Sequence, residues 1–291
     1  MNTNQKLTAL RAEMLEHGIN AYIVLSEDAH QSEYAATHWR SREWLTGFDG
    51  SAGTAVVTQK NAALWVDGRY YIQAARQIEG SGFQLIRAGM DEIEICDWIV
   101  KMLAEELQKA SFDEGTIVVI DGRTLSVSEH EKYQTAFIPY GIRLRTSEDL
   151  IGDIWKERPS LPLDMIFEHD VKFAGKTRVE KLSELRRLMC KKGTEGYLIS
   201  SLDDVAWLYN LRGSDIEFLP VFYAHAFVGM SCAYLFVDEA KLDDKLRAAL
   251  SSDGITLRPY GAITDFLWNY NEPAAIFIDP DRISVHLEEQ I

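Results

Sequence analysis

The chain has 291 residues, 46% of them hydrophobic, which is enough to form about two buried cores. It carries 30 Lys and Arg residues against 45 Asp and Glu residues, and the net charge of −15 opposes binding to nucleic acid or to anionic membranes. No run approaches the roughly 18 apolar residues of a membrane-spanning helix, and the first residues lack an apolar signal segment, so the sequence predicts a soluble, cytoplasmic protein.

The first half begins with a helix that is followed by strands. Leu7, Leu10 and Met14 recur at helical spacing before Gly18, and the apolar run 22–25 then predicts a strand. Further along, the predicted elements are strands over 54–58 and 62–67, a helical stretch over 93–107 and a strand over 117–121.

The second half repeats this order of elements. Thr177 and Glu180 form a capping-box pattern, an apolar stripe follows, and Gly193 ends the helix before a strand over 197–199. The remaining predicted elements are strands over 224–228 and 232–238, a helical stretch over 264–270 and a strand over 275–279.

A weak tandem repeat links the two halves. Matches further along the chain keep the same order of elements but have other offsets between the two halves. The two halves therefore share their helices and strands, while the loops between these elements differ in length. The sequence therefore predicts two duplicated α/β domains, each a mixed sheet flanked by helices, with the first over 1–155, a proline-containing linker over 156–173 and the second over 174–291. Four matched pairs share one offset of 175 residues: Leu10 and Leu185, Met14 and Met189, Gly18 and Gly193, Tyr22 and Tyr197.

The glycine-rich segment 47–54 resembles a phosphate-binding loop only in composition. It precedes a strand instead of a helix, and it lacks the Lys-Ser/Thr pair of such loops. We expect a tight turn that lets backbone segments approach each other closely.

Residues suited to catalysis are scattered along the chain. Acidic pairs such as 203–204 and 279–281 are typical of helix caps and turns, no Gly-x-Ser-x-Gly motif occurs, and the three cysteines are predicted to be reduced and buried. The sequence thus predicts no catalytic residue, metal ligand or cofactor within the chain. The histidines occur singly, at His17, His30, His38, His130, His169, His225 and His286.

Two arginines lie in motifs with more than one interpretation. Arg212, in the Arg-Gly-Ser-Asp sequence that ends at Asp215, is expected to pair with that aspartate and lock a packed turn. Arg69 follows a strand that ends in an Asp67-Gly68 turn, which can project a guanidinium from the rim of a sheet toward a carboxylate or peptide carbonyl. Pairing of Arg69 with a nearby acid is the alternative, and the residues alone favour it.

Several blocks of sequence resemble the amino-terminal part of long-form Xaa-Pro aminopeptidases (aminopeptidase P). The blocks keep their order, and the resemblance extends over nearly the whole chain. In the first domain they are DAHQSEY over 28–34, WLTGFDGSAGTAVV over 44–57 and ALWVDGRYYIQAA over 63–75, and in the second they are DVAWLYNLRGSDI over 204–216 and PVFYA over 220–224.

The resemblance implies a fold and a role. The fold would be two creatinase-type amino-terminal domains with a ribonuclease H-like motif, followed in the full-length protein by a metallopeptidase domain that holds two manganese ions and all catalytic residues. The full-length protein would act, as a homodimer, on peptides with proline in the second position, and Arg69 would be its substrate-binding residue in this region. The catalytic domain would begin where this chain stops, at Ile291, so we expect the chain alone to be inactive.

Two other identities fit the same residues. One is a stand-alone binding or dimerisation module that lacks a catalytic domain. The other is a relative such as prolidase or creatinase, which the blocks over 47–54 and 212–215 fit less well.

Overall fold

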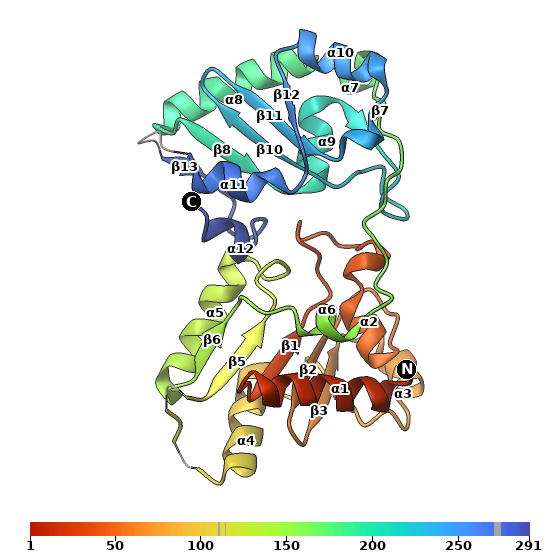
Figure 1. Ribbon diagram of the computed structural model, residues 1–291, viewed down its shortest axis with the longest axis vertical. Coiled ribbons are helices and arrows are strands. Elements are labelled where there is room, and N and C mark those ends of the chain that lie inside the picture. Colours follow the sequence, from red (N-terminus) through yellow and green to blue (C-terminus); the bar gives the residue numbers. More distant parts are fainter. Residues whose placement is uncertain (110, 114, 271–274) are drawn as a thin grey trace. The chain divides into compact units, whose positions relative to one another are not determined.

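A computed structural model describes residues 1–109, 111–113, 115–270 and 275–291. The chain divides into two compact units (Figure 1). The first unit comprises Met1–Ala29 and Thr37–Ser160, and the second comprises His30–Ala36 and Leu161–Ile291. Each unit is an α/β structure with its own sheet, as the sequence predicts.

The first unit is built on a six-stranded mixed sheet in the order β4-β3-β2-β1-β5-β6. Its strands are β1 (Ala21–Val24), β2 (Thr54–Thr58), β3 (Ala62–Val66), β4 (Gln84–Arg87), β5 (Ile117–Ile120) and β6 (Arg143–Arg145). Its helices are α1 (Thr3–Glu16), η1 (Thr37–Trp39), α2 (Ser41–Thr46), α3 (Tyr71–Gln77), α4 (Ile95–Leu107), α5 (Val127–Phe137), η2 (Ile138–Tyr140) and α6 (Leu150–Ile154).

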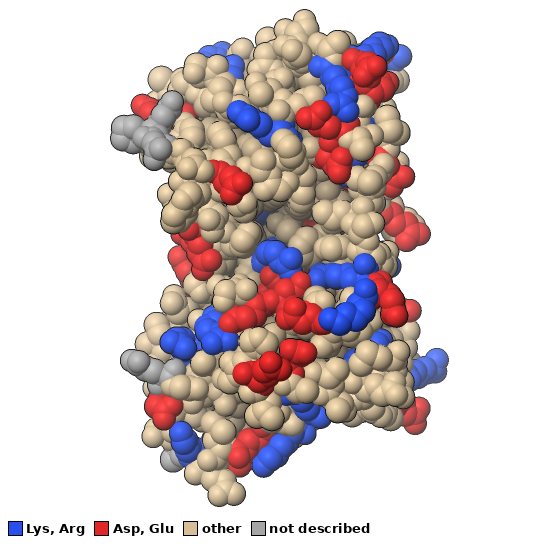
Figure 2. All heavy atoms as spheres, in the orientation of Figure 1, with Lys and Arg blue, Asp and Glu red and all other residues tan. Residues whose placement is uncertain are grey.

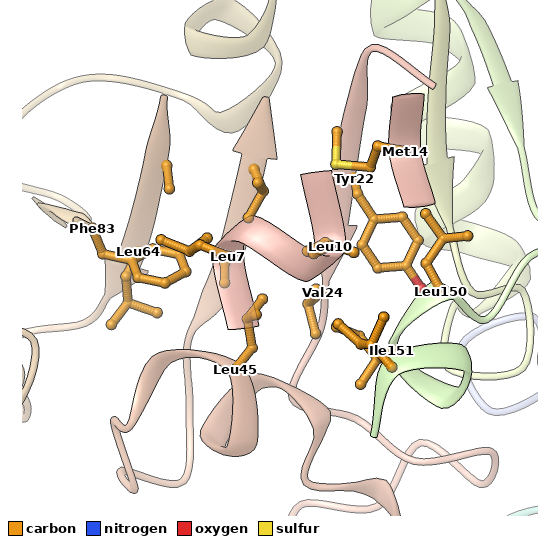
Figure 3. Close-up of a cluster of buried hydrophobic side chains, with 14 of the residues drawn as sticks. Leu7, Leu10, Met14, Tyr22, Val24, Leu45, Leu64, Phe83, Leu150 and Ile151 are labelled. Atoms are coloured by element: carbon orange, nitrogen blue, oxygen red, sulfur yellow. The ribbon is translucent and has the colours of Figure 1, made fainter. Parts of the chain in front are cut away.

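Alternate residues of the central strands face two different helical layers. Tyr22 and Val24 of β1 pack with Leu10 of α1 and Leu150 of α6 in one buried cluster (Figure 3). The opposite face is covered by α4, where the Trp98 ring meets Trp65 of β3 edge-on at 5.4 Å. This alternation is what a strand buried on both sides requires.

The amino-terminal helix α1 begins with a capping box that the sequence analysis did not anticipate. The Asn2 side chain accepts a hydrogen bond from the Gln5 backbone, and the Gln5 side chain accepts one from the Asn2 backbone. Leu7, Leu10 and Met14 are its buried residues, as their spacing predicts.

The second unit contains a five-stranded mixed sheet in the order β12-β11-β10-β8-β13 and a two-stranded ladder, β7-β9. Its strands are β7 (Phe167–Glu168), β8 (Gly196–Ile199), β9 (Leu211–Arg212), β10 (Ala224–Gly229), β11 (Ala233–Val237), β12 (Thr256–Arg258) and β13 (Ile276–Phe277). Its helices are α7 (Val171–Ala174), α8 (Arg178–Lys192), α9 (Leu202–Tyr209), η3 (Glu239–Lys241), α10 (Asp244–Ser252), α11 (Ala262–Trp268) and α12 (Val285–Glu288).

The two large sheets share one topology, which confirms the predicted duplication. Reading β8, β10, β11, β12 and β13 as the counterparts of β1, β2, β3, β4 and β5 gives the same strand order. The directions agree as well: the first strand of each set is antiparallel to the second and parallel to the fifth, and the third is parallel to the fourth. Within the described residues, β6 has no counterpart in the second sheet.

Residues 30–36 belong to the first half of the sequence, but they pack with the second unit. The 28–34 block is predicted to lie in the first domain, and in the structure its residues from His30 onward pack with the second unit. The Arg282 guanidinium donates to the Gln31 carbonyl at 3.3 Å, and the Ala36 amide donates to the Tyr223 hydroxyl at 3.1 Å. We refer to residues 30–36 as the exchanged segment.

The stretch predicted as a linker has structure of its own. The units divide at Ser160 and Leu161, and β7 then pairs with β9 in antiparallel register. In the part of the chain that the structure describes, no helix is long and apolar enough to cross a bilayer.

Candidate functional site

The carboxyl ends of β1, β3 and β5 meet at one edge of the first sheet. β1 and β3 both run antiparallel to the β2 strand between them, and β5 runs parallel to β1, so the three strands point the same way. An Asp-Gly-Arg tripeptide follows two of them, at 67–69 after β3 and at 121–123 after β5. Only the first copy is a predicted site, although the repeated tripeptide is visible in the sequence.

Both tripeptides adopt the same local geometry. The Arg69 amide and Nε donate to Asp67 Oδ1 at 2.9 and 3.0 Å, and its Nη2 donates to Asp67 Oδ2 at 2.8 Å. Arg123 makes the matching contacts to Asp121 at 3.0, 3.0 and 2.6 Å. Each turn therefore fixes its arginine through a bidentate fork to the aspartate two residues earlier.

The surroundings of the two arginines differ. Arg123 is also bound to Asp149, lies 5.3 Å from the Trp39 ring centre and is 34% exposed. Arg69 is 63% exposed, and its guanidinium lies 5.2 Å from the Tyr70 ring centre. Arg123 is part of a partly buried network of ion pairs, whereas Arg69 presents its charge to solvent.

The glycines of the two turns have different steric surroundings. A Cβ on Gly122 would lie 2.7 Å from the Thr146 carbonyl oxygen, whose hydrogen bond from the Gly122 amide is 2.9 Å long. A Cβ on Gly68 would meet only the Tyr71 ring, at 3.9 Å.

We expect Gly122→Ala to lower the free energy of unfolding by about 1–3 kcal/mol, because backbone must shift to admit the methyl group. Gly68→Ala serves as the matched control and should change it by less than about 0.5 kcal/mol. Urea unfolding of both variants checks this, and equal losses would contradict the assigned difference.

The glycine-rich segment 47–54 supports Tyr70, the residue after Arg69. Tyr70 shares a 2.8 Å hydrogen bond with Ser51 and packs edge-on against Phe48, with ring centres 5.6 Å apart. A Cβ on Gly50 would lie 2.8 Å from the Tyr70 ring, so only glycine lets the two segments approach this closely.

The buried side chain of Arg42 binds the backbone of the same glycine-rich segment. Its Nη1 donates to the Phe48 carbonyl at 2.7 Å, its Nη2 donates to the Gly50 carbonyl, and burial lowers the pKa of Arg42 to about 10. Two of the segment's carbonyls thus face a protein cation, which is the arrangement of a structural turn and not of an anion-binding loop.

The electrostatics of the Arg69 turn are those of a surface ion pair. Hydrogen bonds from Arg69 lower the pKa of Asp67. An exposed guanidinium on a fixed turn can bind a carboxylate or a carbonyl oxygen, either beside Asp67 or in exchange for it. On the face shown in Figure 2, acidic and basic side chains are interspersed.

Other candidate residues lie away from this rim. The predicted pair between Arg212 and Asp215 is wrong: Arg212 donates to the Ala206 and Leu211 carbonyls, and Asp215 pairs with Lys241. Buried Asp215 instead accepts from the Tyr223 amide at 2.7 Å.

The cysteines also differ from their prediction. All three are free, but Cys190 is exposed and Cys96 and Cys232 are only partly buried. Burial raises the pKa of the Cys96 thiol to about 11, which makes this thiol a weak nucleophile at neutral pH.

The histidines that look isolated in the sequence are not all isolated in the structure. His30 of the exchanged segment stacks on His225 of β10 with ring centres 4.3 Å apart. Across the described ranges, however, no group of three or more His, Cys, Asp or Glu residues could hold a metal ion. The described residues therefore do not fit a two-metal centre.

Comparison with known proteins identifies both units. The creatinase/prolidase N-terminal domain family matches residues 6–151, and a second family with the same description matches residues 157–291. The chain belongs to the creatinase/prolidase N-terminal domain family, of which it contains two copies in tandem.

Curated relatives that match 90–92% of this chain are named probable Xaa-Pro aminopeptidase P. A probable Xaa-Pro aminopeptidase P from Laccaria bicolor is 38% identical over 270 residues, which are 92% of this chain and 40% of that protein. One from Neosartorya fischeri is 39% identical over 265 residues, or 90% of this chain and 39% of that protein. The chain thus spans about two fifths of the length of these curated relatives.

A solved structure of a relative covers both units. The X-prolyl aminopeptidase from Caenorhabditis elegans, described as a cytosolic enzyme with a di-nuclear active site, has a TM-score of 0.91 and 29% sequence identity. The match covers 100% of this chain and 49% of the nematode chain.

Proposed function

We propose that this chain is the non-catalytic amino-terminal region of a metal-dependent Xaa-Pro aminopeptidase. The whole protein would remove the first residue from peptides that have proline in the second position. The observation that carries the proposal is the match of both units, over 100% of this chain, to the nematode X-prolyl aminopeptidase. The curated relatives, each a probable Xaa-Pro aminopeptidase P, extend well beyond the matched residues.

The catalytic metal centre belongs, in this proposal, to another part of the protein. Two manganese ions are proposed there, whereas the residues described here offer no group of three metal-ligating side chains. The two units would contribute substrate binding and support for the catalytic domain. The proposed setting is the cytosol, as printed for the nematode enzyme, and the proposed assembly is a homodimer of the full-length protein.

Within this region, Arg69 is the proposed substrate-binding residue. Its exposure, its fixed turn and its planar fork suit a peptide carbonyl or carboxylate. Such a contact positions a bound peptide relative to distant reacting groups without taking part in bond cleavage. We therefore assign it to binding and positioning.

The 291-residue chain alone is expected to show no hydrolysis of an Xaa-Pro peptide above the buffer blank when supplied with Mn²⁺. The physical reason is that no described cluster of side chains can hold the metal and activate water. Release of the amino-terminal residue, followed by chromatography, measures this. Turnover that stays with the purified chain and disappears with a chelator would contradict the proposal.

Sequencing the native transcript beyond the codon for Ile291 separates this proposal from a stand-alone binding or dimerisation module. A following domain with clustered carboxylate and histidine side chains that can hold two metal ions supports the peptidase. A stop codon at this point supports the module and overturns the proposed activity.

A further inference from the structure

The proposed function assigns no role to the stacked rings of His30 and His225. Both rings are almost fully buried, with 1% and 3% of their surface exposed. His30 comes from the exchanged segment, and His225 lies in the middle of the second unit's sheet. The contact therefore joins residues that are 195 positions apart in the sequence, between 30 and 225.

We propose that the His30–His225 stack makes docking of the exchanged segment onto the second unit sensitive to protons, so that mild acidification releases the segment. The inference concerns residues of the second unit only and does not depend on peptidase activity.

The hydrogen bonds of His30 define its docked protonation state. Its Nδ1 lies 2.6 Å from the Ser200 carbonyl oxygen, which can only accept, so Nδ1 carries a proton. Its Nε2 lies 2.7 Å from the Tyr260 hydroxyl and accepts from it when the ring is neutral. The neutral ring thus satisfies both nitrogens within the protein.

His225 occupies a position that disfavours charge. Its Nδ1 lies 3.1 Å from Ser200 Oγ, and its ring stacks on Tyr260 with centres 5.2 Å apart. Burial, followed by the neighbouring His30 and His286, holds the pKa of His225 well below its usual value. A proton on either stacked ring would place a buried charge 4.3 Å from a second basic ring.

The other groups around the pair come from four elements. Tyr223 precedes β10 and meets His30 edge-on at 5.4 Å, Tyr260 precedes α11, and His286 lies in α12. Arg282 binds the exchanged segment itself, and Lys241 of η3, paired with Asp215, lies 5.9 Å from the Tyr223 ring centre. Among the described contacts, the side chains next to the rings that can carry charge include the two phenols and the His286 imidazole.

The sign of the pH effect follows from these surroundings. A folded-state pKa below the unfolded value means that the released histidine binds a proton more readily than the docked one. Docking is fully favourable above about pH 6.5, the ordinary histidine pKa, and weakens as the pH falls below it. Between pH 7.5 and 5.5, each histidine that becomes protonated on release favours the released form about tenfold.

Release would change the connection between the units. The chain crosses from one unit to the other on both sides of the exchanged segment and again between Ser160 and Leu161. Release of the segment breaks no covalent bond, and it turns residues 30–36 from a packed part of the second unit into an unpacked stretch of the chain.

Amide hydrogen exchange of the 291-residue chain at pH 7.5, 6.5 and 5.5, corrected for the intrinsic pH dependence of exchange, tests the proposal. These conditions stay above the isoelectric point of about 4.9. We expect residues 30–36 to lose about tenfold protection at pH 5.5 if one histidine is protonated on release, and about a hundredfold if both are. Amides of β2 and β3 should keep their protection over the same range.

Substitutions assign the effect to the pair. His225→Gln keeps a neutral polar side chain and should remove about tenfold of the pH dependence, whereas His17→Gln, at an exposed position in the first unit, should leave it unchanged. If His225→Gln does not fold, Tyr260→Phe, which removes the hydroxyl beside His30 Nε2, should raise the exchange of residues 30–36 already at pH 7.5. Protection of residues 30–36 that does not change with pH, or an equally large change in His225→Gln, would overturn the proposal.

Discussion

Replacing Arg69 with alanine in the full-length protein is expected to lower kcat/KM for an Xaa-Pro peptide by about 10- to 100-fold. The substitution removes a charged, bidentate donor, and the proposed hydrogen bond from Arg69 to substrate would be worth about 1.5–3 kcal/mol. Steady-state kinetics at several peptide lengths measure the loss. It should be largest for peptides long enough to reach the Asp67–Arg69 turn.

Stability measurements distinguish a loss of substrate binding in Arg69→Ala from a loss of folded protein. The Arg69–Asp67 pair is largely exposed, so its removal should change the free energy of unfolding by less than about 0.5 kcal/mol. Arg123→Ala removes contacts to Asp121, Asp149 and the Trp39 ring and should cost about 1–3 kcal/mol.

A surface arginine in the second unit provides the kinetic control. Arg187 is 72% exposed and lies 3.9 Å from Glu184, and Arg187→Ala should leave kcat/KM unchanged. Unchanged kinetics in Arg69→Ala would return Arg69 to the role of a surface ion-pair partner of Asp67.

Replacing Lys241 with methionine is expected to destabilise the second unit by about 3–5 kcal/mol. Lys241 and Asp215 form a buried ion pair, with 2% and 0% of their side chains exposed. Removal of the lysine leaves the Asp215 carboxylate buried without its cation, in a site where burial already raises the pKa of Asp215. Hydrogen exchange of the β10 and β11 amides reports on this unit.

A double substitution distinguishes charge burial from packing. In Lys241→Met combined with Asp215→Asn, the amide can still accept from the Tyr223 backbone, and no unpaired charge remains. The double variant should therefore be more stable than Lys241→Met alone. Lys172→Met, at an exposed pair with Asp170, is the control and should change stability by less than about 0.5 kcal/mol. A double variant as unstable as the single one would assign the loss to packing.

The same region shows how the two copies have diverged. β3 and β11 are counterparts, and each is followed by an aspartate, Asp67 in the first unit and Asp238 in the second. Asp67 leads into Gly68 and Arg69, whereas Asp238 caps the short helix η3, which carries the buried Lys241. In one copy the cation faces solvent, and in the other it stabilises the interior.

Local patterns were sufficient for the elements that are buried and regularly spaced. β2 and β3 and their counterparts β10 and β11 consist of apolar runs that end at polar turns, and the sequence predicts all four. β4 and β12 were missed because they are short, lie at sheet edges and carry exposed polar residues. Period-two patterning is weak in such strands.

Contacts between residues that are distant in the sequence could not be predicted. Residues 30–36 contain polar and aromatic residues without periodicity, and nothing local indicates that His30 pairs with residues near 200 and 225. The error at Arg212 has the same origin, since Asp215 lies three residues away but pairs with Lys241. For Arg69, the sequence predicts the turn, but the bidentate hydrogen bonds to Asp67 are known only from the structure.

The exchanged segment also affects the order in which the two units can be completed during synthesis. All six strands of the first sheet precede Ser160, so that sheet can form while the second unit is still being made. Residues 30–36 must then wait, unpacked, until Ser200, His225 and Tyr260 have left the ribosome. A polypeptide that starts at Leu161 would lack the seven residues 30–36, of which His30, Gln31, Ala35 and Ala36 are buried, and a separate peptide would be needed to supply them.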